Sequence, residues 1–235
     1  MPVKQAASKV KRFEPQSVSN DCMRTLQRIV VVGVLLMLFL VVALFIYSKN
    51  LKHSAEKVVR VSYELSQRES PPTLEDLRQR LGTQLRQSAA CTDSGCGYEV
   101  TMSNRLLFKL RLAPYTALRS SFWVRDNVLE ENVVEVFTVN RRGGMVAYVD
   151  AKYCEECSDF DIGPCVGATA SVRSGSVRIG SRSRPVDKQV AFGFNTECLS
   201  SLRGCASVAE LLPTMWSTTS DGTLQCASSD HESKP

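Results

Sequence analysis

The sequence contains very little histidine and few aromatic residues. Among 235 residues there are two His, His53 and His231, and Phe, Tyr and Trp together make up 7%. Hydrolases of the Ser-His-Asp or Cys-His kind need an imidazole as general base. His53 lies close to a long apolar run and His231 in a polar C-terminal segment, so neither is well placed to be that base. The scarcity of histidine therefore argues against such a hydrolase.

Motifs for nucleophilic catalysis and for binding phosphate or dinucleotides are missing as well. The sequence has no Gly-x-Ser-x-Gly elbow, no Gly-rich loop ending in Lys-Ser/Thr and no Gly-x-Gly-x-x-Gly fingerprint. The net charge of +5 is modest and spread along the chain, which disfavours nucleic acid as a partner. We predict no catalytic residue, no cofactor and no metal site, and we expect a protein that is not an enzyme.

The dominant feature that is present is an uncharged apolar run over residues 29–47, IVVVGVLLMLFLVVALFIY. A helix of this length reaches about 28 Å, close to the roughly 30 Å hydrocarbon core of a bilayer. The run is longer than the apolar part of a signal peptide, and no small-x-small cleavage site follows it. We therefore predict one transmembrane helix that serves as an uncleaved signal-anchor.

Lys and Arg residues around this run do not decide its orientation. Residues 1–28, which we expect to be a disordered basic tail, hold six Lys or Arg, yet close to the run more of them follow it than precede it. The cysteines decide instead. Cys22 precedes the run and eight others follow it, as in an oxidised, exported domain. We predict a cytoplasmic N-terminus and an extracytoplasmic domain, with the bacterial periplasm as the compartment.

The eight downstream cysteines are candidates for disulfides, although their connectivity cannot be read from spacing. Cys154-Glu155-Glu156-Cys157 permits three interpretations: a redox pair, half of a zinc site, or structural cysteines that bridge to distant partners. The two glutamates disfavour a reactive thiolate and no second pair has zinc spacing, so we favour structural bridges. Cys91 and Cys96 are close enough to close a small loop. The eight candidates are Cys91, Cys96, Cys154, Cys157, Cys165, Cys198, Cys205 and Cys226.

Residues 48–70 are predicted to continue the helix as a stalk. Leu51, Ala55, Val58, Ser62 and Leu65 recur at steps of 4, 3, 4 and 3, the spacing of a heptad seam. The seam has two interpretations: a stalk that forms a homodimer, or a helix that lies against its own domain. Two heptads are too few to choose between them.

Residues 71–227 are expected to form one α+β domain with a mostly antiparallel sheet and a Cys-rich C-terminal half, followed by a polar tail over 228–235. Thr73 and Asp76 form a capping box for a helix with a leucine stripe. Alternating patterns then predict strands, and Pro213 ends a short helix. The predicted strands are residues 98–102, 106–112, 120–125, 133–139, 145–149 and 188–194, and the predicted short helices are 196–202 and 208–212.

A run of cations, Arg173, Arg178, Arg182, Arg184 and Lys188, also permits two interpretations. It can present positive charge to an anionic polymer or lipid headgroup, or it can protect an exposed hairpin or edge strand from pairing. We favour the second.

In outline, an N-terminal anchor, a helix and an antiparallel sheet are similar to pilins and pseudopilins, but the apolar run lacks their Gly-Phe-Thr-Leu-Ile-Glu-type start. Outline alone says little about function. The sequence predicts a single-pass membrane protein with a non-catalytic binding or scaffolding role towards a protein or an envelope polymer. The alternatives are a thiol-disulfide oxidoreductase that uses Cys154 and Cys157, another envelope enzyme, or a sensor ectodomain.

Overall fold

The computed structural model describes residues 17–68, 70–88, 91–92, 94–155, 157, 160–163, 173–218 and 224–226. The chain divides into two compact units, Met1–Phe45 and Ile46–Pro235. The predicted C-terminal tail lies outside the described residues, as do the first sixteen residues. Residues 17–28, which we expected to be part of a disordered tail, are instead helical, because no Pro or Gly interrupts the helix after Pro15.

The described part of the first unit belongs to the helix α1 (Ser17–Ser66). Its large apolar side chains from Met23 to Phe45, apart from the half-buried Leu44, are exposed around the helix. The most apolar stretch of 18 residues in this helix has a mean hydropathy of 3.5, and none of its residues is buried. A helix that is apolar on all faces is typical of a membrane span, and this one is long and apolar enough to cross a bilayer.

In the second unit, α1 is amphipathic rather than apolar throughout. Ala55, Val58, Ser62 and Leu65 are at most 1% exposed and contribute to the core or lie within it. The seam predicted for a stalk is therefore buried in its own domain, which is the second of the two arrangements considered. The helix ends at Ser66 and not at residue 70.

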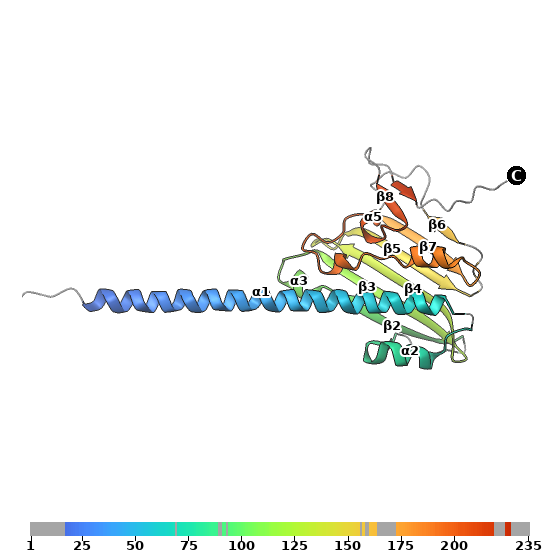
Figure 1. Ribbon diagram of the computed structural model, residues 1–235, viewed down its shortest axis with the longest axis horizontal. Helices are drawn as coiled ribbons and strands as arrows, with labels where there is room; N and C mark the ends of the chain where they lie inside the picture. The colour runs from blue at the N-terminus through green and yellow to red at the C-terminus, as the bar shows by residue number, and fades with distance from the viewer. Residues whose placement is uncertain are drawn as a thin grey trace, which may run out of the picture. The chain divides into compact units, whose positions relative to one another are not determined.

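A seven-stranded sheet forms the centre of this unit (Figure 1). Neighbouring strands are antiparallel except β5 and β7, which are parallel. The mostly antiparallel sheet and the packed helix confirm the predicted α+β class. The strands, in their order across the sheet, are β1 (Arg86–Gln87), β2 (Cys96–Ser103), β3 (Tyr115–Arg125), β4 (Val128–Val139), β5 (Met145–Cys154), β7 (Ser174–Gly180) and β6 (Asp161–Gly163).

Short helices and a second, two-stranded sheet complete the domain. The capping box predicted for Thr73 and Asp76 is present at the start of α2. The remaining elements are α2 (Leu74–Leu81), η1 (Gly82–Gln84), α3 (Arg105–Lys109), α4 (Pro185–Ala191), η2 (Thr196–Leu199), α5 (Val208–Leu211), and the paired strands β8 (Trp216–Thr218) and β9 (Leu224–Cys226).

Two predicted strands are wrong. Residues 106–112 form α3 and a turn, because β2 pairs directly with β3 and leaves the intervening chain outside the sheet. The side-chain amide of Asn104 holds the two ends of this segment together. Its Nδ2 donates to the Pro114 carbonyl (2.9 Å), and its Oδ1 accepts from the Thr116 N–H (2.8 Å). Residues 188–194 were also predicted as a strand, but most of them belong to α4, which begins at Pro185, a residue favoured in a first helical turn.

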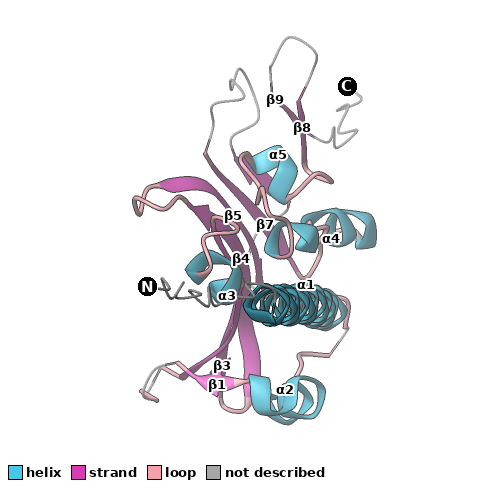
Figure 2. Cartoon of the chain, turned by 90° about the vertical axis from the view of Figure 1, so that its left-hand side faces the viewer, coloured by secondary structure: helices cyan, strands magenta, loops and turns pink. Residues whose placement is uncertain are grey.

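Helices cover one face of the sheet. Figure 2 shows the second part of α1 together with α2 and α4 on the same side. The inward residues of β3, β4 and β5 alternate with half-buried or exposed ones, as expected for a sheet with one open face. A buried polar contact fixes α1 on this face: Ser62 Oγ lies 3.2 Å from Ser120 Oγ, and Asn132 Nδ2 donates to the Ser62 carbonyl at 3.5 Å.

Candidate functional site

The three disulfides whose two cysteines are both described are local. They join Cys91 to Cys96, Cys154 to Cys157 and Cys198 to Cys205, with sequence separations of 5, 3 and 7. The small loop expected for the first pair is present. Cys154 and Cys157 were expected to bridge to distant partners, and this is wrong, because they bond to each other.

Cys226 is disulfide-bonded too, and Cys165 lies outside the described residues. All seven described cysteines of the domain are therefore oxidised, which fits an oxidising compartment.

The strand register shows which residues lie at each of the two ends of the domain. At the near end α1 enters from the apolar run: the Tyr47 hydroxyl donates to the Ser103 carbonyl (3.1 Å) at the end of β2. At the far end, where β2 begins and β5 ends, Cys96 pairs with Val124 and Cys154 with Glu131. Two disulfides thus lie at the far end.

A cleft of about 510 Å³ opens at the far end, lined by Trp123, Arg125, Glu130, Glu131, Cys154 and Glu155. Trp123 Nε1 (3.2 Å) and Arg125 Nε (2.9 Å) both donate to the carbonyl of Ser94, which lies inside the Cys91–Cys96 loop. The small disulfide loop is therefore held against the cleft by two of its lining side chains. We take this cleft as the candidate site, because it combines an aromatic ring, charges and a half-buried Cys-x-x-Cys disulfide.

Most of the charge in the cleft is paired. Arg125 Nη1 lies 3.0 Å from Glu130 Oε1, and Lys152 Nζ lies 2.7 Å from Glu131 Oε2. Within the described residues Cys154 ends β5 and lies at no helix N-terminus, so the neighbouring glutamates leave a thiolate there without electrostatic support. Among the described residues there is no group of three or more His, Cys, Asp or Glu that could hold a metal ion.

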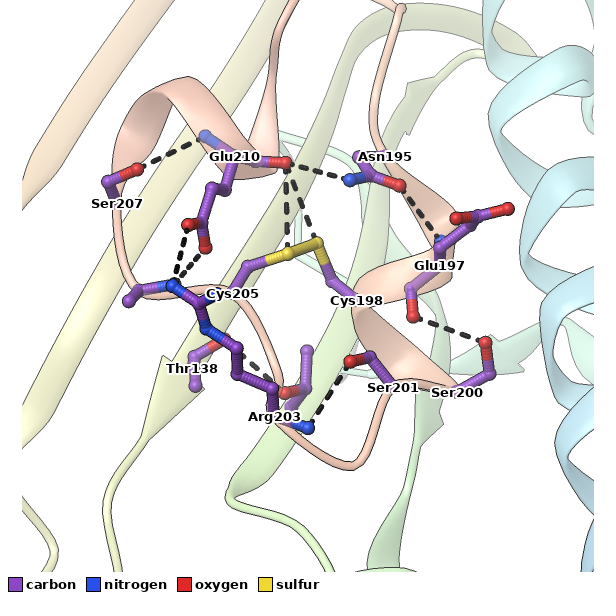
Figure 3. Close-up of a disulfide and its surroundings, with 12 residues drawn as sticks. Thr138, Asn195, Glu197, Cys198, Ser200, Ser201, Arg203, Cys205, Ser207 and Glu210 are labelled. Atoms are coloured by element: carbon purple, nitrogen blue, oxygen red, sulfur yellow. Dashed lines mark hydrogen bonds and ion pairs between the residues drawn. A yellow bond between two sulfur atoms is a disulfide. The ribbon is translucent and has the colours of Figure 1, made fainter. Parts of the chain in front are cut away.

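The third disulfide, Cys198–Cys205, closes a loop at the near end (Figure 3). Both sulfurs lie against the Glu210 carbonyl oxygen, at 3.6 and 3.7 Å, and Asn195 Nδ2 donates to the same oxygen at 3.0 Å. The Glu210 carboxylate accepts from the Ala206 N–H (2.7 Å) and lies 3.6 Å from Arg203. The Ser48 hydroxyl donates to the Ser200 carbonyl (3.3 Å) and places this loop beside the start of the domain.

Two further clefts flank α1. One of about 540 Å³ lies against β2 and includes Tyr47 and Gln84, and the buried Gln84 Oε1 has no hydrogen-bond partner in the described part of the chain. The other, of about 480 Å³, lies against α4 and includes Tyr63 and Phe192, whose rings are 6.5 Å apart. The residues that line these two clefts include no His and no Cys.

The open face of the sheet holds a polar cluster that the sequence did not reveal. Tyr148 donates to Glu135 (3.2 Å), and Ser176 donates to Asp150 (2.9 Å). Burial raises the pKa of Tyr148, as do the nearby carboxylates, and burial raises the pKa of Asp150. These residues come from three strands, so only the sheet order β4-β5-β7 brings them together.

The cation run does not form one surface. Arg178 lies in β7, which is paired with β5 on one side and β6 on the other, so it is not on an edge strand. Arg184 bonds to Asp187, and Lys188 is buried. The Lys188 ammonium donates to the Ser66 carbonyl (2.7 Å) at the C-terminus of α1, and burial lowers the pKa of this amine.

No family model, curated protein or solved structure matches this chain.

Proposed function

We infer that this chain is a single-pass membrane protein whose disulfide-bonded domain lies outside the cytoplasm, in the periplasm of a bacterium, and acts by binding or scaffolding. One combination of observations supports this: a helix apolar enough to span a membrane precedes a domain whose described cysteines are all bonded. Stable disulfides belong to oxidising compartments. Cys22 would then lie on the cytoplasmic side.

The far-end cleft supports binding over catalysis. Two of its three carboxylates, Glu130 and Glu131, are held in ion pairs, whereas a general acid or base must be free to exchange a proton. His53 lies on α1 with its side chain 85% exposed, away from the cleft-lining residues. The partner is a protein or an envelope polymer.

Alkylation of right-side-out membrane vesicles with an impermeant maleimide tests the topology. Without reductant we expect no labelling of the bonded cysteines; after an impermeant phosphine reductant we expect labelling of the half-buried Cys154 and Cys157. Cys22 serves as an internal control, because it should react only after the vesicles are opened. Labelling of Cys22 in sealed vesicles, with free thiols in the domain, would contradict the proposal.

A second candidate function is thiol-disulfide exchange by Cys154 and Cys157. Their local Cys-x-x-Cys disulfide at the cleft favours it. A partner dithiol would reduce this bond to two thiols and itself become a disulfide.

Replacing both cysteines by Ser separates the candidates. Loss of exchange with a folded domain would support a redox role, whereas a variant that fails to accumulate would indicate a structural pair. The matched control is Cys91→Ser with Cys96→Ser, which removes the other far-end disulfide and leaves the Cys-x-x-Cys pair intact.

A further inference from the structure

Exposed apolar side chains gather at the near end of the domain. Outside α1, the described chain has six large exposed hydrophobic residues, and five of them lie in three near-end segments; the sixth is Val186 in α4. Single exposed apolar residues are ordinary, but a cluster marks an interaction site. The five are Leu106, Leu110, Leu112, Met145 and Leu202, with exposed fractions of 40, 43, 43, 46 and 62%.

Specific contacts hold these three segments together. The Arg141 guanidinium donates to the Arg111 carbonyl, which joins the β4–β5 turn to the segment after α3. Gly204 lies against Pro114, so closely that a Cβ at this glycine would meet the Pro114 Cγ at 2.5 Å. The Cys198–Cys205 disulfide closes the loop that carries Leu202. The three segments that carry the exposed apolar residues are therefore fixed relative to one another.

The same segments are basic. Residues 104–118 and 139–149 contain no Asp or Glu. Their five exposed cations form no ion pair with any residue that the structure describes, and the nearby Glu197 and Glu210 are already paired with Lys52 and Arg203. The five cations are Arg105, Lys109, Arg111, Arg141 and Arg142. Together with the five apolar residues they form what we call the near-end patch.

Hydrogen bonds tie this patch to the end of the apolar run. Tyr47, the last residue of the run, bonds to Ser103, two residues before α3 begins. Ser48 bonds to Ser200, two residues before Leu202. If the run spans a bilayer, as the proposed function requires, Tyr47 lies at headgroup level, where tyrosine is enriched. The patch is then within reach of the same headgroups.

We propose that the near-end patch docks the domain on the anionic phospholipid headgroups of the membrane in which the chain is anchored. This inference rests on the proposed membrane span. Leucine and methionine side chains enter the boundary between headgroups and acyl chains, and the arginines and lysine pair with lipid phosphates. The absence of carboxylates in the two longer segments favours an anionic surface over an acidic-and-basic protein interface.

Hydrogen–deuterium exchange of the full chain in lipid vesicles tests the proposal. We expect backbone amides of residues 105–112 and 141–145 to exchange several-fold more slowly in phosphatidylcholine mixed with phosphatidylglycerol than in phosphatidylcholine alone. High salt should remove the difference, because it screens headgroup attraction. Equal exchange in the two lipids would overturn the proposal. Protection in detergent that rises with protein concentration would also overturn it, because it would indicate contact between copies.

Charge reversal provides the matched variants. Lys109→Glu with Arg142→Glu should abolish the protection by phosphatidylglycerol, whereas Arg78→Glu with Arg182→Glu, two exposed cations outside the patch, should leave it unchanged. Equal effects of the two pairs would overturn the proposal. Alkaline extraction reports the membrane span separately: a chain that is extracted yet still protected contradicts the proposed span and not the patch.

Discussion

The first part of α1, up to Phe45, and its second part, from Ile46 to Ser66, differ in which faces carry apolar side chains. The first part is apolar on all sides and exposed. The second buries one face against the sheet and has exposed charged residues such as Lys57 and Arg60. Both parts have the same helical pattern of backbone hydrogen bonds. The difference in their surroundings therefore shows only in which faces of the helix carry apolar side chains. Changes in each part should therefore affect different properties of the protein.

The largest effect is expected in the first part. Arginine at both Leu36 and Leu40 places two charges in the middle of the apolar run, at a cost of about 2.5–3.5 kcal/mol each for membrane insertion. The doubly substituted chain should be released by alkaline extraction. Alanine at the same two positions is the control and should remain in the membrane; if the arginine variant also remains, the run does not act as a simple span.

In the second part, Val58→Arg should unfold the domain. Val58 is fully buried, and an unpaired charge there costs roughly 3–5 kcal/mol. Thermal unfolding followed by circular dichroism in detergent measures the loss, while membrane retention should be unchanged. His53→Arg introduces the same side chain at an exposed position of the same helix and should be silent. A stable Val58→Arg protein would show that the helix does not pack on the sheet.

A smaller effect is expected where the second part meets the sheet through polar groups. Asn132→Ala removes two buried hydrogen bonds, the one donated to the Ser62 carbonyl and the one accepted from the Ser120 hydroxyl, and each lost bond costs about 0.5–1.5 kcal/mol. Urea unfolding should show this loss. Thr101→Ala, on the exposed face of β2, is the comparison and should change the stability little; equal losses would remove the special role of the buried contact.

The smallest effect concerns α2, whose first turn contains Asp76. Hydrogen bonds from the Thr73 N–H and from Arg68 lower the pKa of Asp76 from 3.8 to about 2. Because the folded pKa is depressed, this stabilisation is complete above about pH 4 and is lost as the pH falls towards 2. Asp76→Asn should cost about 1 kcal/mol at pH 7, in the range of other helix-capping groups, and clearly less at pH 2, where the Asp76 carboxyl of the folded chain is about half protonated. Thermal melts at both values check this.

Local patterns predicted most of the sheet. The alternation in residues 120–125, 133–139 and 145–149 lies within β3, β4 and β5, because each strand has one buried face. The same alternation in residues 106–112 misled us. Only Leu107, which is out of phase with the pattern, is buried there. The exposed leucines of that segment belong to the near-end patch, so an interaction surface resembled a core strand.

Other features depended on contacts that no local pattern records. The heptad-like spacing in the second part of α1 correctly identified a buried face, but spacing does not say whether the covering surface is a second copy or the chain's own sheet. The far-end cleft joins Trp123 from β3, Glu131 from β4 and Cys154 from β5. Their proximity follows from the strand register, which is settled by pairing over the whole sheet.

The short span of the three described disulfides has a consequence for the order of folding. Loops of fewer than ten residues close within about 100 ns, so each pair can meet without waiting for distant strands. Oxidation can therefore follow the chain as it emerges, Cys91 with Cys96 first and Cys198 with Cys205 last. The parallel alignment of β7 with β5 is slower, because it closes a longer connection than any of these three loops. For these three pairs, correct partners are set by neighbourhood in the chain, and a disulfide isomerase has little to correct.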